Sequence, residues 1–171
     1  GEFLPGAVFE VYNNSNELIH TVTTGEDGSV VIKELIPGKY SIKEVSSPVG
    51  YIANEELITF SIDENGVVNG FDNNTITVNN APTKVVLSKT DITNSEPVAG
   101  AKITIRDASN NVVFTDITSE DGTITINTLP VGTYTFTETV APDGYVVSDE
   151  TYSFTINDDG TVTGSTSFTN K

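Results

Sequence analysis

The sequence predicts an all-β protein made of two tandem β-sandwich domains with Ig-like, Greek-key character. First, short stretches that alternate apolar with polar residues and are rich in β-branched side chains recur along the chain, as in Val8–Tyr12 and Thr123–Ile126. Second, Asp-Gly and Asn-Gly pairs, the usual two-residue hairpin turns, separate these stretches. Third, the whole pattern occurs twice, and no stretch shows a convincing helical apolar period of 3.6 residues.

The domain count follows from an internal duplication. When the chain is shifted by 94 positions, residues 6–70 pair with residues 100–164 without a gap, and 23 of these 65 positions are identical. Unrelated sequences share far fewer, so the two halves are copies of one module. After residue 70 the first copy carries four extra residues, and Asn80 then pairs with Asn170. The expected domains are residues 1–82 and 83–171.

The individual strands are expected where β-branched or aromatic residues alternate with polar ones. In chain order these stretches are Val8–Tyr12, Tyr40–Glu44, Val78–Asn80, Val85–Lys89, Lys102–Ile105, Thr123–Ile126, Tyr134–Glu138 and Phe168–Asn170. Turns are expected at Asp27-Gly28, Asn65-Gly66, Asp121-Gly122 and Asp159-Gly160. The acidic turns lack the ligand spacing of an EF-hand, so we interpret them as hairpin turns and expect no metal.

Composition and charge exclude several classes of protein. The 171 residues carry 24 acidic and 8 basic side chains, a formal net charge of −16, whereas a nucleic-acid binder needs Lys and Arg to displace phosphate counterions. The longest apolar runs are about three residues, so this segment is not expected to insert into a membrane. Without cysteine, a thiol nucleophile, a disulfide and a thiolate metal site are excluded. The sequence contains one histidine, His20, so we do not expect a histidine-based catalytic triad.

Three polar side chains of the second copy occupy positions where apolar residues are expected. Strand side chains alternate between two faces, so Lys89, Glu138 and Asn170 point to the same side as the large apolar residues two positions before them. Each placement alone has an ordinary explanation, such as a lysine at a strand end that extends its amine to solvent. Together they bring an amine, a carboxyl and a carboxamide to one core, where an unpaired ammonium would cost several kcal/mol.

These residues belong to five motifs of the second copy. In order they are Leu87–Asp91, Val98–Ala101, Gly132–Glu138, Ala141–Tyr145 and Phe168–Asn170. Together they resemble the Cna B-type domain of Gram-positive surface adhesins and pilins, and the resemblance covers both copies. It implies an intramolecular isopeptide bond between Lys89 and Asn170, assisted by Glu138.

The three residues suit the implied chemistry. Burial disfavours the charged forms of both an amine and a carboxyl group. Lys89 would then be a neutral nucleophile, and a protonated Glu138 would polarise the Asn170 carboxamide and relay protons while ammonia leaves. The folded core holds the reactants together, which can lower the barrier by about 7–11 kcal/mol. One bond forms once, so we expect neither an ordinary enzyme nor a cofactor.

The first copy has the carboxyl and the carboxamide at the matching positions, Glu44 and Asn80, but no matching lysine. The position equivalent to Lys89 falls before residue 1. The first domain is therefore expected to lack its N-terminal strand and its isopeptide bond, and to expose an open sheet edge. Two interpretations remain open. Either a Lys-bearing strand from elsewhere adds to this edge, with Asn80 as potential acceptor and Glu44 as potential proton relay, or the domain is merely truncated.

The resemblance implies a structural role outside the cell. We expect a stalk segment of a Gram-positive cell-wall-anchored adhesin or pilin, whose partners are the neighbouring domains of the same surface protein. A second interpretation is a module that binds a host ligand such as a matrix protein. No large aromatic patch in the sequence singles out such a ligand.

Overall fold

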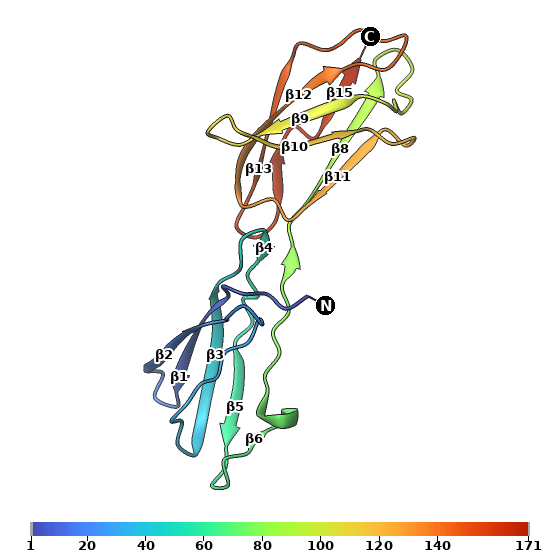
Figure 1. The fold of residues 1–171 in the computed structure, drawn as a ribbon. Coiled ribbons are helices and arrows are strands. Elements are labelled where there is room, and N and C mark those ends of the chain that lie inside the picture. The colour runs from blue at the N-terminus through green and yellow to red at the C-terminus, as the bar shows by residue number, and fades with distance from the viewer. Residues whose placement is uncertain (1, 171) are drawn as a thin grey trace. The chain divides into compact units, whose positions relative to one another are not determined.

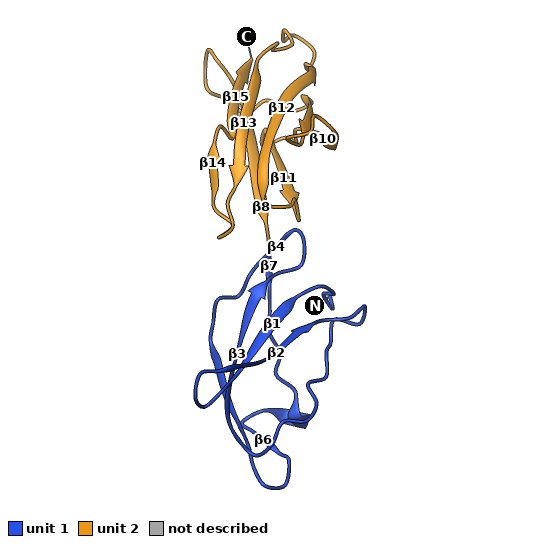
Figure 2. Cartoon of the chain, turned by 90° about the vertical axis from the view of Figure 1, so that its left-hand side faces the viewer, with its two compact units in different colours: residues 1–81 blue, residues 82–171 orange. Residues whose placement is uncertain are grey.

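The chain forms two compact units, residues 1–81 and residues 82–171 (Figure 2). The computed structural model describes residues 2–170 of the chain, and these residues contain no α-helix. Regular structure is almost entirely β-strand, so the expected all-β fold with two domains is confirmed.

The first unit is built on one five-stranded antiparallel sheet. Its elements are β1 Val8–Asn13, β2 Leu18–Thr23, β3 Gly38–Ser46, β4 Tyr51–Ile52, β5 Ile58–Ile62, β6 Val68–Asn69 and the 3-10 turn η1 Asp72–Asn74, and the short strand β7 Ala81–Pro82 begins at its last residue. The sheet has the order β2-β1-β3-β5-β6 (Figure 1). β4 and β7 form a separate two-stranded sheet. Alternate residues of β1, β3 and β5 form its core: Phe9, Val11, Tyr40, Ile42 and Phe60.

The second unit is a sandwich of two sheets. Its strands are β8 Lys84–Asp91, β9 Lys102–Arg106, β10 Val112–Ile117, β11 Thr123–Asn127, β12 Gly132–Val140, β13 Thr151–Ile156, β14 Val162–Gly164 and β15 Ser167–Asn170. One sheet has the order β10-β9-β12-β13-β14, and the other has the order β11-β8-β15. Apolar side chains from both sheets share one buried core. The central strand β8 runs antiparallel to β11 and parallel to β15.

The two five-stranded sheets are copies of each other. β2 and β10 occupy the same positions in the repeat, as do β3 and β12, and the strand order is the same in both sheets. Equivalent stacked ring pairs support them, Tyr40–Phe60 in the first unit and Tyr134–Phe154 in the second, each with centroids 5.5 Å apart. The duplication seen in the sequence is therefore a duplication of tertiary structure.

The three-stranded sheet of the second unit has no counterpart among the described residues of the first. Residues 29–33 and 75–80, which match β11 and β15, are not strands. This differs from the strand expected at Val78–Asn80. In the second unit both flanking strands pair with β8. No described strand equivalent to β8 lies between residues 29–33 and 75–80. The backbone N–H and C=O groups of these segments therefore lack the strand with which β11 and β15 form their hydrogen bonds.

Candidate functional site

Three different strands position the candidate residues of the second unit. Lys89 lies near the end of the central strand β8, Glu138 in β12 of the opposite sheet and Asn170 at the end of β15. All three point into the core as alternation predicts, and their exposed fractions are 0%, 5% and 2%. The structure thus brings together the amine, the carboxyl and the carboxamide that the sequence singled out.

The three side chains form a closed set of polar contacts. The Lys89 amine donates a hydrogen bond to Asn170 Oδ1, and its Nζ lies 3.3 Å from Glu138 Oε1. The Asn170 amide nitrogen donates to both oxygens of Glu138, at 2.8 and 2.9 Å. Glu138 therefore contacts the nucleophilic nitrogen on one side and the carboxamide nitrogen on the other.

The amine of Lys89 is buried against an aromatic ring. Lys89 Nζ lies 4.2 Å from the centroid of the Phe168 ring, and Phe168 packs edge-on against Phe136 at 5.4 Å. Burial in this apolar shell lowers the pKa of the Lys89 amine below its ordinary value, and the adjacent Glu138 opposes the shift only in part. A lowered pKa favours the neutral amine, which is the nucleophilic form.

Two supporting contacts were missed from the sequence. The backbone N–H of Ser148 donates to Glu138 Oε2 at 2.7 Å and fixes the carboxyl group. The Tyr145 hydroxyl donates to Asp91 Oδ2 at 3.0 Å and holds the end of β8. Every residue except proline has a backbone N–H, so the residue type does not show that Ser148 donates to Glu138. Tyr145 and Asp91 belong to two of the five motifs, but the alternation of side chains does not show which residues form a hydrogen bond with each other.

Gly122 sets the backbone position of Lys89. Its carbonyl accepts a hydrogen bond of 2.8 Å from the Lys89 backbone N–H. It has a φ of +74°, and a Cβ at this position would lie 2.6 Å from the Lys89 carbonyl oxygen. Any other residue would therefore displace β8 at the point where the amine enters the core.

We expect Gly122→Ala to lower the free energy of unfolding of the second unit by about 2–3 kcal/mol, because it adds a backbone clash to the strain of positive φ. Gly144→Ala is the matched control, since Gly144 also has positive φ, +90°, but a Cβ at that position would meet no atom within 4 Å. Its expected cost is about 1 kcal/mol. Denaturant unfolding measures both, and equal losses would contradict the proposed clash.

The first unit contains the same arrangement without the lysine. Glu44 in β3 is buried, with an exposed fraction of 2%, and Asn80 is half-buried. The Asn80 amide nitrogen donates to Glu44 Oε2 at 2.7 Å and to the Ile52 carbonyl at 2.8 Å. The backbone N–H of Asn54 donates to Glu44 Oε2 at 2.6 Å, as Ser148 does to Glu138. Among the described residues, Glu44 Oε1 has no hydrogen-bond partner although it is buried.

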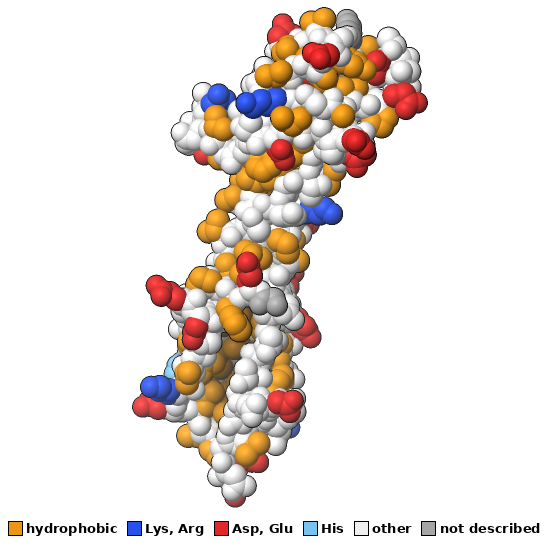
Figure 3. All heavy atoms as spheres, turned by 45° about the vertical axis from the view of Figure 1, so that its right-hand side comes forward, with side chains coloured by type: hydrophobic (Ala, Val, Ile, Leu, Met, Phe, Trp, Pro, Cys, Tyr) orange, Lys and Arg blue, Asp and Glu red, His pale blue; other side chains and the backbone are white. Residues whose placement is uncertain are grey.

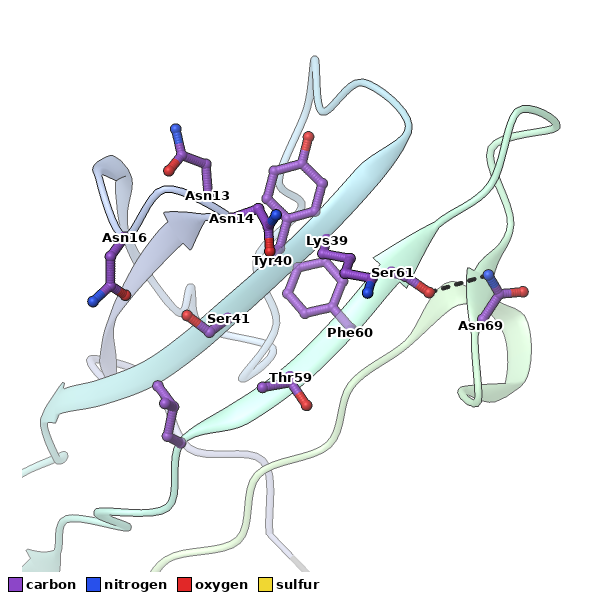
Figure 4. A pocket seen from close by; sticks show the side chains of 11 residues that line it. Asn13, Asn14, Asn16, Lys39, Tyr40, Ser41, Thr59, Phe60, Ser61 and Asn69 are labelled. Atoms are coloured by element: carbon purple, nitrogen blue, oxygen red, sulfur yellow. Dashed lines mark hydrogen bonds between the residues drawn. The ribbon is translucent and has the colours of Figure 1, made fainter.

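Other candidate sites are weaker. A surface pocket of about 550 Å³ on the first unit is lined by asparagines of the β1–β2 turn and by residues of β3 and β5 (Figure 4). The pocket is open to solvent, and Lys39 is the one charged residue among those that line it. Within residues 2–170 no group of three or more acidic or histidine side chains could hold a metal ion. The same residues contain no helix long and apolar enough to cross a membrane.

Comparison with known families gives two matches. The family described as SpaA, prealbumin-like fold domain, matches residues 1–75 and again residues 83–171. The matches cover both units and nearly the whole chain.

Two bacterial proteins are among the individual relatives. The trypsin-resistant surface T6 protein of Streptococcus pyogenes is 45% identical over 64 residues, which is 37% of this chain and 12% of the relative. Serine-aspartate repeat-containing protein D of Staphylococcus aureus is 29% identical over 164 residues, which is 86% of this chain and 12% of the relative. The chain thus spans about an eighth of the length of these relatives.

Solved structures show the same fold. The Bacillus anthracis TIE protein superposes with a TM-score of 0.54 at 33% identity, over 92% of this chain and 29% of that one. A C-terminal fragment of the pilus adhesin SpaC from Lactobacillus rhamnosus GG gives a TM-score of 0.52 at 19% identity, over 96% of this chain and 87% of the fragment.

Proposed function

The chain belongs to the SpaA family of prealbumin-like fold domains, and from this membership we propose that it is a stalk segment of a Gram-positive adhesin or pilin anchored to the cell wall. Its relatives include Gram-positive surface and pilus proteins, and the chain is a structural protein rather than an enzyme. The partners that fit this role are neighbouring domains of the same surface protein. The second unit would be stabilised by an isopeptide bond between Lys89 and Asn170 that the protein forms by itself.

One observation carries the proposed bond. An amine, a carboxyl and a carboxamide, all nearly excluded from solvent, contact one another in a dry core. A buried ion pair is a weak source of stability, because desolvation of the two charges offsets their attraction. Formation of an amide bond would convert the buried amine into a neutral group and remove the desolvation cost of its charge. A reaction between these groups therefore explains the arrangement better than ionic stabilisation does.

The reaction balances with the groups present. Lys89 Nζ attacks Asn170 Cγ and forms a carbon–nitrogen bond, and the bond from Cγ to Nδ2 breaks. One proton leaves the attacking amine and one reaches Nδ2, so that ammonia departs and the carboxyl of Glu138 is regenerated. Glu138 contacts both nitrogens, which suits it to relay this proton. The described contacts include none from Glu138 to Asn170 Oδ1, so the relay is better supported than the expected polarisation of the carbonyl.

Ammonia could leave the site through a pocket next to Asn170. A pocket of about 310 Å³ is lined by Asn170 together with residues of the segment before β13, among them Val146, Val147 and Ser148. Because Asn170 lies at the edge of the core, its leaving group does not have to cross the apolar interior. Departure of ammonia makes the step irreversible in dilute solution.

The bond would give the unit a mechanical role. It joins β8, the first strand of the second unit, to β15, the last. A force applied to the two ends of the unit would then pass through the covalent link, and the residues between 89 and 170 would remain folded. Such a module suits a stalk that must hold a bacterium against flow.

The mass of the intact chain tests this proposal. We expect a mass about 17 Da below that of the sequence, equal to one ammonia, because one amide bond replaces one amine and one carboxamide. After digestion, one peptide should contain the segments around Lys89 and Asn170 joined together. An unshifted mass would refute the bond. A loss of twice this value would show that the first unit has also reacted.

A further inference from the structure

The surface pocket of about 550 Å³ on the first unit lies on the face of the five-stranded sheet that points away from the core. Tyr40 and Phe60 contribute their side chains to the core, so their neighbours in β3 and β5 point to the opposite face. All four of these neighbours line the pocket: Lys39, Ser41, Thr59 and Ser61. Tyr40 and Phe60 also border it, between these neighbours. The pocket therefore does not depend on what covers the core.

Amide and hydroxyl groups dominate the lining of this pocket. Amides of the β1–β2 turn border one side, and hydroxyl and amide groups of β5 and β6 lie on the other (Figure 4). The side chains concerned are Asn13, Asn14, Asn16, Thr59, Ser61 and Asn69. Such groups are uncharged and both donate and accept hydrogen bonds. A ligand that matches them is itself a neutral molecule with many donors and acceptors.

Some of these groups are engaged within the protein, and others are available. The Asn13 carboxamide oxygen accepts from the backbone N–H groups of its own turn, at 2.9 and 3.0 Å. The Asn69 amide nitrogen donates to the Ser61 hydroxyl at 3.2 Å. Among the described hydrogen bonds, none involves the side chain of Asn14, Asn16 or Thr59. These three side chains keep their full hydrogen-bonding capacity for a ligand.

Apolar surface lies beside the available amides. Leu57 lines the pocket and has an exposed fraction of 56%. Tyr12 is paired with Ser41 in the register of β1 and β3 and is half-buried. It follows the core residue Val11, so its ring points to the outer face. A sugar ring has an apolar C–H face as well as hydroxyl groups, so it suits a site that combines such side chains with amides.

The second unit differs at the positions equivalent to this pocket. Its residues there are Arg106 for Tyr12, Asp107 for Asn13, Ala108 for Asn14, Thr151 for Leu57 and Thr163 for Asn69. Thr133 and Thr155, which replace Lys39 and Ser61, lie with their hydroxyl oxygens 3.0 Å apart. Because the two five-stranded sheets have the same order, this fold forms without the amides and the tyrosine. The pocket chemistry is a property of the first unit alone.

The charge of the chain favours an uncharged ligand. The formal net charge is −16, and Figure 3 shows acidic side chains spread over the visible face of both units. Such a field repels an anionic ligand. Lys39 is the one charged residue that lines the pocket, and its exposed amine lies in water. A single exposed lysine provides little attraction to offset this repulsion.

We propose that this pocket binds a neutral oligosaccharide. Asn14, Asn16 and Thr59 would form hydrogen bonds with its hydroxyl groups, and Tyr12 and Leu57 would pack against the C–H face of a sugar ring. The volume lies within the range of small-ligand sites, and the open shape admits one part of a longer glycan. This binding function goes beyond the stalk role and does not depend on the bond proposed for the second unit.

Weak binding at one such site is compatible with adhesion. An open pocket leaves much of the ligand in water, so a single site gains little affinity. A surface that displays many copies of the chain would bind a multivalent glycan layer with an avidity about 10²–10⁴-fold higher.

Nuclear magnetic resonance of the nitrogen-15-labelled full chain tests the proposal. The probes are three neutral tetrasaccharides, maltotetraose, chitotetraose and lacto-N-neotetraose, and one charged tetrasaccharide of hyaluronan. We expect at least one neutral probe at millimolar concentration to shift the side-chain amide signals of Asn14 and Asn16 in a saturable way. The signals of Asn110, in the equivalent turn of the second unit, should not move.

Matched variants assign the binding to the pocket. Asn14→Ala introduces the residue that the second unit carries, and Asn16→Gly removes an amide at a positive φ of 63° that glycine adopts without strain. Each should weaken binding about 3–10-fold, the loss expected for one hydrogen bond. Asn110→Gly makes the same change at a φ of 66° in the equivalent turn and should leave the affinity unchanged.

Three results would overturn the proposal. The first is the absence of saturable shifts with all three neutral probes. The second is binding that Asn14→Ala and Asn16→Gly leave intact, or that moves signals outside the pocket alone. The third is binding of the hyaluronan probe without any neutral one, which would indicate an anion site at Lys39. The intact mass of the same sample reports the bond of the second unit, so the two proposals fail or stand separately.

Discussion

A chain that carries Glu138→Ala is expected to keep the full mass of its sequence, even after long incubation. Among the described residues, Glu138 is the one ionisable group that contacts both the Lys89 amine and the Asn170 amide nitrogen. Loss of a general acid–base group typically slows a reaction about 10²–10⁴-fold. The same change leaves the buried amine without its neighbouring carboxyl group. Intact-mass measurement gives the fraction of chains that remain unlinked.

Two further variants keep this test informative if Glu138→Ala disturbs folding. Glu138→Gln keeps the volume and can still accept the N–H of Ser148, yet it cannot carry a proton between the nitrogens, so it should also remain unlinked. Glu44→Ala removes the equivalent carboxyl of the first unit and should leave the mass loss of the second unit unchanged. A folded Glu138→Gln chain that still loses one ammonia would show that the carboxyl group has no role in the reaction.

Much of the fold was predictable because local chemistry determines it. Alternation of apolar and polar residues predicted β1 and β3 of the first five-stranded sheet and β9 and β12 of the second, but not the outer strands of either sheet. It also predicted β8, β11 and β15, and Asp-Gly turns such as Asp121-Gly122 were expected between strands. Alternation also predicted that Lys89, Glu138 and Asn170 face the core, which their burial confirms. The duplication placed Glu44 and Asn80 at the positions of Glu138 and Asn170, although the strand expected at Val78–Asn80 is not formed.

What the sequence could not give depends on partners distant along the chain. Residues 29–33 have the same β-branched character as β11, yet they are not a strand, because strand formation depends on a neighbour to pair with. Alternation shows which face a side chain takes but not what it meets. The contact of Glu138 with the amide nitrogen of Asn170, and the unsatisfied Glu44 Oε1, therefore needed the structure.

The two units should differ strongly in stability when the bond is present. A link between residues 89 and 170 closes a loop of about 80 residues, and by analogy with disulfide loops this stabilises the unit by about 4 kcal/mol. For a domain of this size that corresponds to a rise in Tm of roughly 20 °C. In the described residues of the first unit, Glu44 Oε1 has no hydrogen-bond partner and several core side chains are only partly buried, so we expect no such link there. We expect two separate transitions on heating, with the second unit unfolding last and resisting trypsin longest.

Lys89→Met tests whether the bond causes this difference. The substitution preserves side-chain length and nearly preserves volume at a buried site, so the packing cost is small, but it removes the link and leaves the buried Glu138 carboxyl without the amine. We expect the Tm of the second unit to fall by roughly 20 °C and that of the first to remain unchanged. Glu138→Gln should lower it by a similar amount, because both variants lack the bond although they alter different contacts. Scanning calorimetry with limited proteolysis assigns each transition to a unit. If Lys89→Met leaves the higher transition in place, the stability of the second unit comes from its completed core, with Val85 and Leu87 of β8 in position, and the covalent link adds nothing.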